Sequence, residues 1–231
     1  MTNDISALFQ QLSAQVRETL DPLGYRETER GAFHTGHVPH VAPYAYLAKF
    51  YPGLDENGLE AAEAECDRFI PAPYREFLQN SNGLWLGKLS LHGATFGSVD
   101  RTDFLVGKPI SLSYQNIHER PDYIPNGHLG IGAMDGEWYS QGRLYLSSMG
   151  EVEMYHREAN LLGARWVSFA DFLRSEIPRQ LSLYDAEGNL KPETKKLPGD
   201  TDDWEAVGKV AGEQRRRASG VRGKLAALFR R

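Results

Sequence analysis

Cysteine is almost absent from this sequence of 231 residues, and long apolar runs are missing altogether. The single cysteine, Cys66, excludes an internal disulfide and a cysteine-rich zinc site. No stretch approaches the ~18 consecutive apolar residues of a transmembrane helix, so no membrane span is expected. Neither the basic start nor the uninterrupted apolar core of a secretory signal is found in the first residues, MTNDISALFQQLSAQV. These absences together predict a cytoplasmic protein.

Negative charge dominates most of the chain but not its end. Residues 1–190 contain 15 Lys/Arg and 25 Asp/Glu, a net charge of −10, whereas residues 191–231 contain 11 and 6, a net charge of +5. An acidic body argues against binding of nucleic acid across its surface, because phosphates would be repelled, and it is compatible with a basic protein partner. Solubility alone would explain the acidity equally well.

Helical spacing of apolar residues predicts four helices, at 5–20, 58–69, 72–78 and 169–177. The first should end before Pro22, because proline disfavours the α conformation in the residue before it. The second should bury Cys66 and Phe69 on one face. Cys66 is interpreted as a small buried hydrophobe, since no basic residue is arranged to activate its thiol. Ser168 should cap the last helix.

Strand-like alternation follows the short third helix. Asn82-Gly83 predicts a turn, because glycine adopts left-handed backbone geometry without a steric penalty. LWLGKLSLHG alternates after this turn as a strand does. Further strands are expected near 44–50 and at 128–133, 143–147 and 151–155.

The chain changes character after residue 184. Residues 185–203 are polar, charged and interrupted by Pro and Gly, which predicts a linker or an extension. Residues 214–231 contain seven Lys/Arg and no acidic residue. Such a cluster can bind phosphate or an anionic membrane surface, and it can equally dock on the acidic body. We therefore expect one domain at 1–184 and a basic extension at 185–231.

Residues suited to catalysis or metal binding are few. His34, His37 and His40 lie three apart, and three imidazoles can bind zinc. However, Gly36 and Pro39 preclude a regular helix, so a solvated loop without metal is expected. Gly-x-Ser-x-Gly, P-loop and His-Glu-x-x-His motifs are absent. No catalytic residue and no cofactor are predicted, and a hydrolase using two of the carboxylates Asp100, Asp103, Asp135 and Glu137 ranks below a binding role.

Aromatic residues are the better candidates for partner contact. Asp135, Glu137, Trp138 and Tyr139 form an acidic-aromatic loop, and Trp85 follows the Asn-Gly turn. Trp and Tyr are enriched among the residues that dominate binding energy at interfaces. The alternative is that these side chains, Trp85 in particular, face the core.

The stretch PGLDENGLEAAEAECDRFIPAPYREFLQNSNG resembles the start of the SMI1/KNR4 family, also called the SUKH superfamily. LSLHG, IPNGHLGIGAMDGEWY, RLYLSSMGEVEMY and WVSFADFL resemble its later elements, so the match runs from about 52 to 177. Three positions depart from the family pattern: Asp67 replaces a glycine, His92 an aromatic residue and Ser147 an aspartate. The matching positions are Pro52, Gly53, Glu63, Ile70, Pro71, Tyr74, Phe77, Leu78, Asn82, Gly83, Gly93, Pro125, Gly127, Leu129, Ile131 and Gly132.

This resemblance implies an α+β fold in which helices pack against one face of a twisted, mostly antiparallel sheet. It also implies a non-enzymatic, protein-binding role. Bacterial members are typically immunity proteins that neutralise a cognate toxin, often a nuclease, which here would present a basic domain. Fungal members act as scaffolds in cell-wall signalling, and this alternative stays open. A structural role is expected for the motif residues Pro71, Tyr74, Phe77, Asn82, Gly83 and Gly132.

Overall fold

A single antiparallel sheet organises the protein. The computed structural model describes residues 4–95, 108–135, 141–192, 197–198, 204, 206–210 and 213. Within these residues, nine strands pair in the order of the chain, each antiparallel to its neighbours. The strands are β1 (Tyr25–Glu27), β2 (Phe33–His37), β3 (Tyr46–Phe50), β4 (Leu84–Leu86), β5 (Leu89–Leu91), β6 (Leu129–Met134), β7 (Gly142–Leu146), β8 (Val152–His156) and β9 (Leu162–Trp166).

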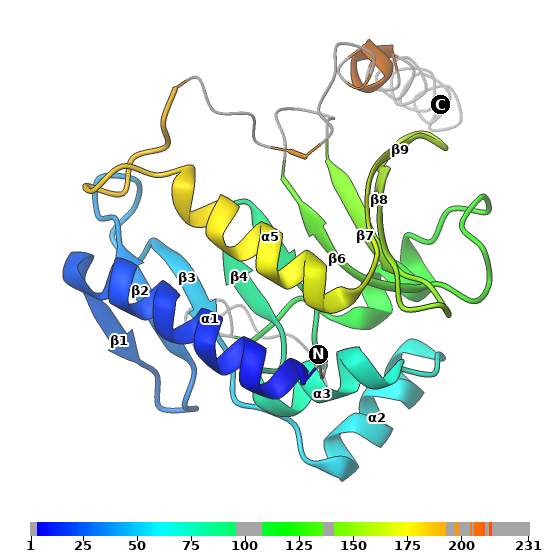
Figure 1. The fold of residues 1–231 in the computed structure, drawn as a ribbon, viewed down its shortest axis with the longest axis horizontal. Coiled ribbons are helices and arrows are strands. Elements are labelled where there is room, and N and C mark those ends of the chain that lie inside the picture. Colours follow the sequence, from blue (N-terminus) through cyan, green and yellow to red (C-terminus); the bar gives the residue numbers. More distant parts are fainter. Residues whose placement is uncertain are drawn as a thin grey trace, which may run out of the picture.

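Helices cover one face of this sheet. They are α1 (Ile5–Leu20), α2 (Glu56–Cys66), α3 (Ala72–Asn80) and α5 (Phe169–Ser182). Two short helical segments, η1 (Asp21–Leu23) and η2 (Tyr114–His118), connect other elements and are not part of this layer. In Figure 1, α1 and α5 lie side by side across the sheet, and α3 packs next to α1. The predicted α+β fold, with a mostly antiparallel sheet and helices on one face, is confirmed.

The core forms between these helices and alternate residues of the strands. Side chains alternate between the two faces of a strand, so Leu84 and Leu86 are buried among the core residues while Trp85 points to the opposite face. Phe77 from α3 and Phe169 from α5 meet with ring centroids 5.7 Å apart, and Tyr74 packs against both. Burial of such aromatic side chains dominates core energetics.

Side-chain caps determine where the helices begin. Asp4, Asp55 and Ser168 each accept a hydrogen bond from a backbone N–H of the first turn. The second helix is shorter than predicted and ends at Cys66, because Asp67 adopts a left-handed conformation with φ of 51°. This turn directs Phe69 into solvent with 76% of its surface exposed, so the expectation that Phe69 is buried was wrong.

Three strands were not predicted: β1, β2 and β9. Strand β2, FHTGH, contains two polar histidines and a glycine, and it is a strand because β1 and β3 pair with it on both sides. The solvated loop expected at the histidines is therefore wrong for His34 and His37. His34 is buried and His37 half-buried, and both rings contact Tyr46; only His40 is exposed.

Two residues of the C-terminal extension lie in the core. Leu197 and Trp204 are each only 1% exposed, and the Trp204 ring packs against the edge of His156 with centroids 4.6 Å apart. Figure 1 shows this part of the chain beside β8 and β9. The division at residue 185 stays a prediction, but the extension has at least two buried contacts with the body. Residues 214–231 lie outside the described residues.

Candidate protein-binding site

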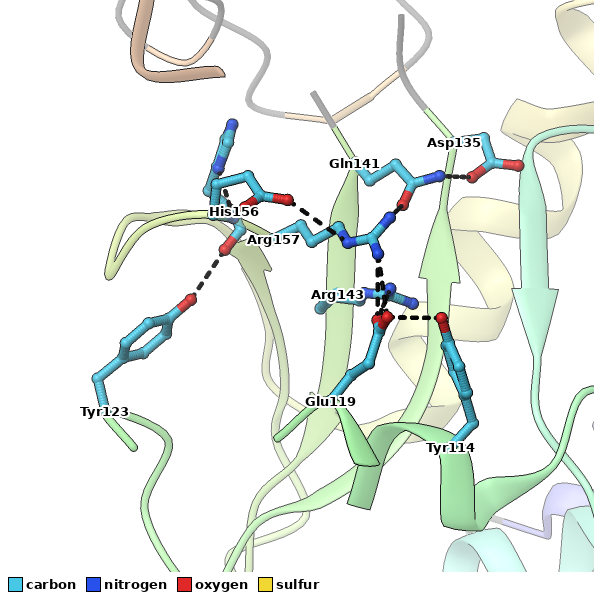
Figure 2. A network of polar contacts seen from close by, with 9 residues as sticks. Tyr114, Glu119, Tyr123, Asp135, Gln141, Arg143, His156 and Arg157 are labelled. Atoms are coloured by element: carbon cyan, nitrogen blue, oxygen red, sulfur yellow. Dashed lines mark hydrogen bonds and ion pairs between the residues drawn. The ribbon is translucent and has the colours of Figure 1, made fainter. Parts of the chain in front are cut away.

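A network of ion pairs lies on the sheet face away from the helices. It centres on Glu119, the residue that follows η2 (Figure 2). Arg143 of β7 places Nη2 at 2.5 Å from Glu119 Oε2, and Arg157 places Nη2 at 3.1 Å from Oε1. The hydroxyl of Tyr114 donates to Oε1 at 2.6 Å. This carboxylate thus joins η2 to β7 and to the end of β8, since three elements contribute its partners.

The network continues to both ends of the β6–β7 turn. Arg157 donates to Gln141 Oε1 at 2.7 Å, and Gln141 donates through Nε2 to Asp135 Oδ1 at 2.8 Å. The backbone N–H of Asp135 also donates to the carbonyl of Lys88 at 2.8 Å. Figure 2 shows these side chains in a continuous chain of polar contacts. The two ends of the predicted acidic-aromatic loop are therefore held by a network anchored in the sheet.

A pocket of about 410 Å³, which we call the arginine pocket, lies against this network. Burial raises the pKa of Tyr123 to about 12, and its hydroxyl donates to the backbone carbonyl of His156. The hydrogen bond to Glu119 raises the pKa of Tyr114, because it stabilises the neutral phenol. These phenols therefore stay protonated at neutral pH. The pocket is lined by His118, Glu119, Arg120, Pro121, Tyr123, Arg143, Arg157 and Glu158.

Ion pairs and a hydrogen bond hold Glu119 in place at the edge of the pocket. Glu119 is shared between two guanidinium groups and a phenol, so its oxygens are already occupied by donors. Arginine stays charged at any physiological pH and holds carboxylates with defined geometry. The arrangement therefore fixes the positions of Asp135 and Gln141, the described ends of the β6–β7 turn.

Asp135 and Trp85, the two predicted contact residues that the structure describes, lie at separate places. Asp135 belongs to the network described above, whereas Trp85 lines a separate groove over β3 and β4. Glu137, Trp138 and Tyr139 lie outside the described residues. Glu119, Arg143 and Arg157 were not predicted from the sequence. The only signal was an arginine among the apolar residues of GRLYL, which predicts a buried charge with a partner.

The motif residues surround the end of α3. The hydroxyl of Tyr74 lies 2.6 Å from the carbonyl of His92 and 2.9 Å from that of Ile131, next to β5 and β6. Asn82 pairs with both backbone groups of Ala94, donating at 2.9 Å and accepting at 2.7 Å. Gly83 has φ of 93°. These contacts connect the helical layer to the sheet.

The other motif residues are also packed into the fold. Pro71 occupies the N-cap position of α3, and Phe77 is fully buried. Gly132 lies so close to β5 that a Cβ there would overlap the Ser90 carbonyl. The proposal that the six motif residues have a structural role is consistent with these positions.

Few of the described residues are suited to nucleophilic chemistry or metal binding. Burial raises the pKa of the Cys66 thiol to about 11, which keeps it protonated at neutral pH. No group of three or more His, Cys, Asp or Glu among the described residues could hold a metal ion. No described helix has the length and apolar character needed to cross a membrane. A cytoplasmic location stays a prediction.

Comparison with known proteins identifies the family. No curated protein matches this chain. The model of the SMI1 / KNR4 family (SUKH-1) matches residues 53–175, from the segment before α2 to the middle of α5. This match spans more than half of the chain and includes the end of α3, the arginine pocket and both ends of the β6–β7 turn. The chain belongs to the SMI1/KNR4 family (SUKH-1).

Proposed function

We propose that this protein is a non-enzymatic protein-binding module that acts as an immunity protein, neutralising a cognate bacterial toxin with a basic binding surface. The observation that carries the proposal is membership of the SMI1/KNR4 family, which includes immunity proteins. The net charge of −10 on residues 1–190 supports it. A nuclease toxin needs a cationic groove for phosphates, and an acidic inhibitor can fill that groove by charge complementarity.

An acidic surface lies at α2. Residues 55–67 contain six carboxylates and no Lys or Arg. Asp55, Glu56, Glu60 and Asp67 are exposed, and Phe69, two residues after Asp67, is 76% exposed. We call these five residues the acidic surface. An exposed aromatic residue at one end of a row of exposed carboxylates offers both an apolar anchor and charged groups to a partner.

Ion pairs and hydrogen bonds to other elements hold several carboxylates of α2 in place. Arg75 of α3 forms ion pairs with both Glu56 and Glu63. Glu65 accepts hydrogen bonds from the hydroxyls of Thr95 and Ser111, at 2.9 and 2.5 Å. These contacts hold α2 in place, so a partner would meet a preformed surface rather than one that must first be ordered. We propose the β6–β7 hairpin, with Asp135, Glu137, Trp138 and Tyr139, as a second contact.

The experiment is co-expression with a candidate toxin: the C-terminal domain of a secreted protein encoded next to this one. We expect growth to be rescued and the two proteins to co-purify at low salt. Association should slow by roughly tenfold or more between low and high salt, because charge steering is screened over ~8–10 Å near physiological ionic strength.

Charge reversal locates the contact. Glu60→Lys should weaken protection without lowering the melting temperature, and Asp135→Lys with Glu137→Lys should weaken protection without unfolding the protein if the hairpin contributes. Glu18→Lys, an exposed carboxylate on α1, makes the same type of charge change away from the acidic surface and should leave protection intact. Neither growth rescue nor a complex at low salt would reject the immunity role in favour of a scaffold. A tight complex indifferent to salt would retain immunity and reject the electrostatic mechanism.

A further inference from the structure

A second cavity opens on the sheet face away from the helices, over β3 and β4. Its volume is about 450 Å³, within the ~300–1,000 Å³ range of small-molecule sites. We call it the aromatic groove. Aromatic and apolar side chains form most of its walls, with two lysines among them: Tyr46, Tyr51, Trp85, Ile110, Lys49 and Lys108. This composition, mainly apolar with a few charged groups, is typical of sites that bind one small ligand.

Strand register explains why these side chains meet. Arg26 pairs with His34, His34 with Lys49, and Lys49 with Trp85, so the four residues form one row across β1 to β4. Directly paired residues of antiparallel strands lie on the same face with neighbouring Cβ atoms. Since Leu84 and Leu86 face the helices, this row faces the groove side of the sheet.

The row concentrates positive charge beside an aromatic wall. Lys49 Nζ lies 6.0 Å from the centre of the Trp85 ring. Burial and the nearby charge of Arg26 lower the pKa of Lys49, and burial together with Lys49 and Arg26 lowers the pKa of His34 to about 4. These basic groups oppose one another's protonation. A carboxylate or phosphate in the groove would be attracted to the positive charge of Lys49.

We propose that the aromatic groove binds a small planar aromatic or heteroaromatic molecule that carries a carboxylate or a phosphate. Its ring would stack on Trp85 and the tyrosines, which offer flat apolar surfaces at low entropic cost. Its anionic group would be directed to Lys49 and Lys108. This inference does not rest on the immunity role, because the groove is basic and aromatic whereas the acidic surface lies at α2.

The test measures binding to the full-length protein by calorimetry. Two charged probes distinguish the sources of this chemistry: adenosine 5′-monophosphate as a nucleotide and indole-3-acetate as an aromatic acid. Adenosine and indole-3-acetamide are their neutral controls. We expect at least one acid to bind with 1:1 stoichiometry, and about tenfold more tightly than its neutral control, because the lysines recognise the charge.

Variants locate the site. Trp85→Leu should weaken binding about tenfold through lost stacking, and Lys49→Met should abolish the preference for the charged probe. Lys88→Met, in the turn between β4 and β5 and outside the groove lining, is the matched control and should bind as the wild type does. If Trp85→Leu does not fold, Trp85→Phe with Lys49→Met carries the test.

Several results would overturn the proposal. They are no binding of either acid at millimolar concentration, equal affinity for the acids and their neutral controls, or binding unchanged in folded Trp85 and Lys49 variants. Binding of the nucleotide alone or of the aromatic acid alone would support the proposal and define the ligand class.

Discussion

We expect the buried Trp204 to make the free energy of unfolding depend on the C-terminal extension. Truncation after residue 185 should leave a body that folds cooperatively but is less stable than the full chain. The truncation removes Leu197 and Trp204, both 1% exposed. Losing a fully buried tryptophan costs about 3–5 kcal/mol in core substitutions. Typical domains have only ~5–15 kcal/mol in total, so this loss is readily measured.

Trp204 packs against Gly163 of β9, so this contact can be tested directly. A Cβ added at Gly163 of β9 would overlap the Trp204 ring. Gly163→Ala should therefore destabilise the wild type by ~1–3 kcal/mol, as overpacking does. In a Trp204→Ala background the space is empty, so the same substitution should cost much less. The difference is a coupling energy, measured by a double-mutant cycle of urea unfolding curves.

A substitution at an exposed residue near Trp204 is the control. Val210→Ala, on the same helical segment but 56% exposed, should change stability by less than about 0.5 kcal/mol. If Trp204→Ala unfolds at the wild-type urea midpoint, the tryptophan is not a core residue. If the two substitutions are additive, Gly163 and Trp204 are not in contact, and the extension is a linker as its composition suggested.

Three further substitutions test the fold by urea denaturation. Gly83→Val should destabilise the folded protein by more than ~1 kcal/mol, because φ at this residue is 93° and a Cβ would lie 2.8 Å from the Leu91 carbonyl oxygen. An unchanged urea midpoint would refute the turn assignment. Asp67→Gly should stabilise by up to ~1 kcal/mol, since glycine relieves the left-handed strain at this helix end, and a loss of stability would contradict this. Burial lowers the pKa of His92 from 6.5 to about 3. Below pH 6.5 the unfolded chain therefore binds a proton that the folded chain does not. The free energy of unfolding should fall by up to ~1.4 kcal/mol per pH unit toward pH 3. His92→Phe should flatten this acid dependence between pH 4 and 7, and an equally steep dependence in the variant would assign it to other groups.

Local patterns determined the helices and most of the strands in this protein. Apolar spacing placed α1, α3 and α5, and alternation placed β6 to β8, because these signals act within a few residues of sequence. LWLGKLSLHG was expected to form one strand, but Gly87 with φ of 56° makes a turn that divides it into the antiparallel pair β4 and β5. The end of α2 was not predicted: the helix was expected to continue to Phe69, whereas Asp67 adopts the left-handed conformation that favours glycine. Family membership was equally readable, since its motif residues form short contiguous patterns.

Tertiary structure alone decided which distant residues meet. Strands β1, β2 and β9 are short and carry weak alternation, and pairing with neighbouring strands makes them part of the sheet. Glu119 meets Arg157, 38 positions along the chain, only because η2 packs against β6, which the sheet places beside β7 and β8. Trp204 showed no periodic link to the core, yet it is buried against β8 and β9. Such contacts depend on strand register and layer packing, which no local sequence pattern specifies.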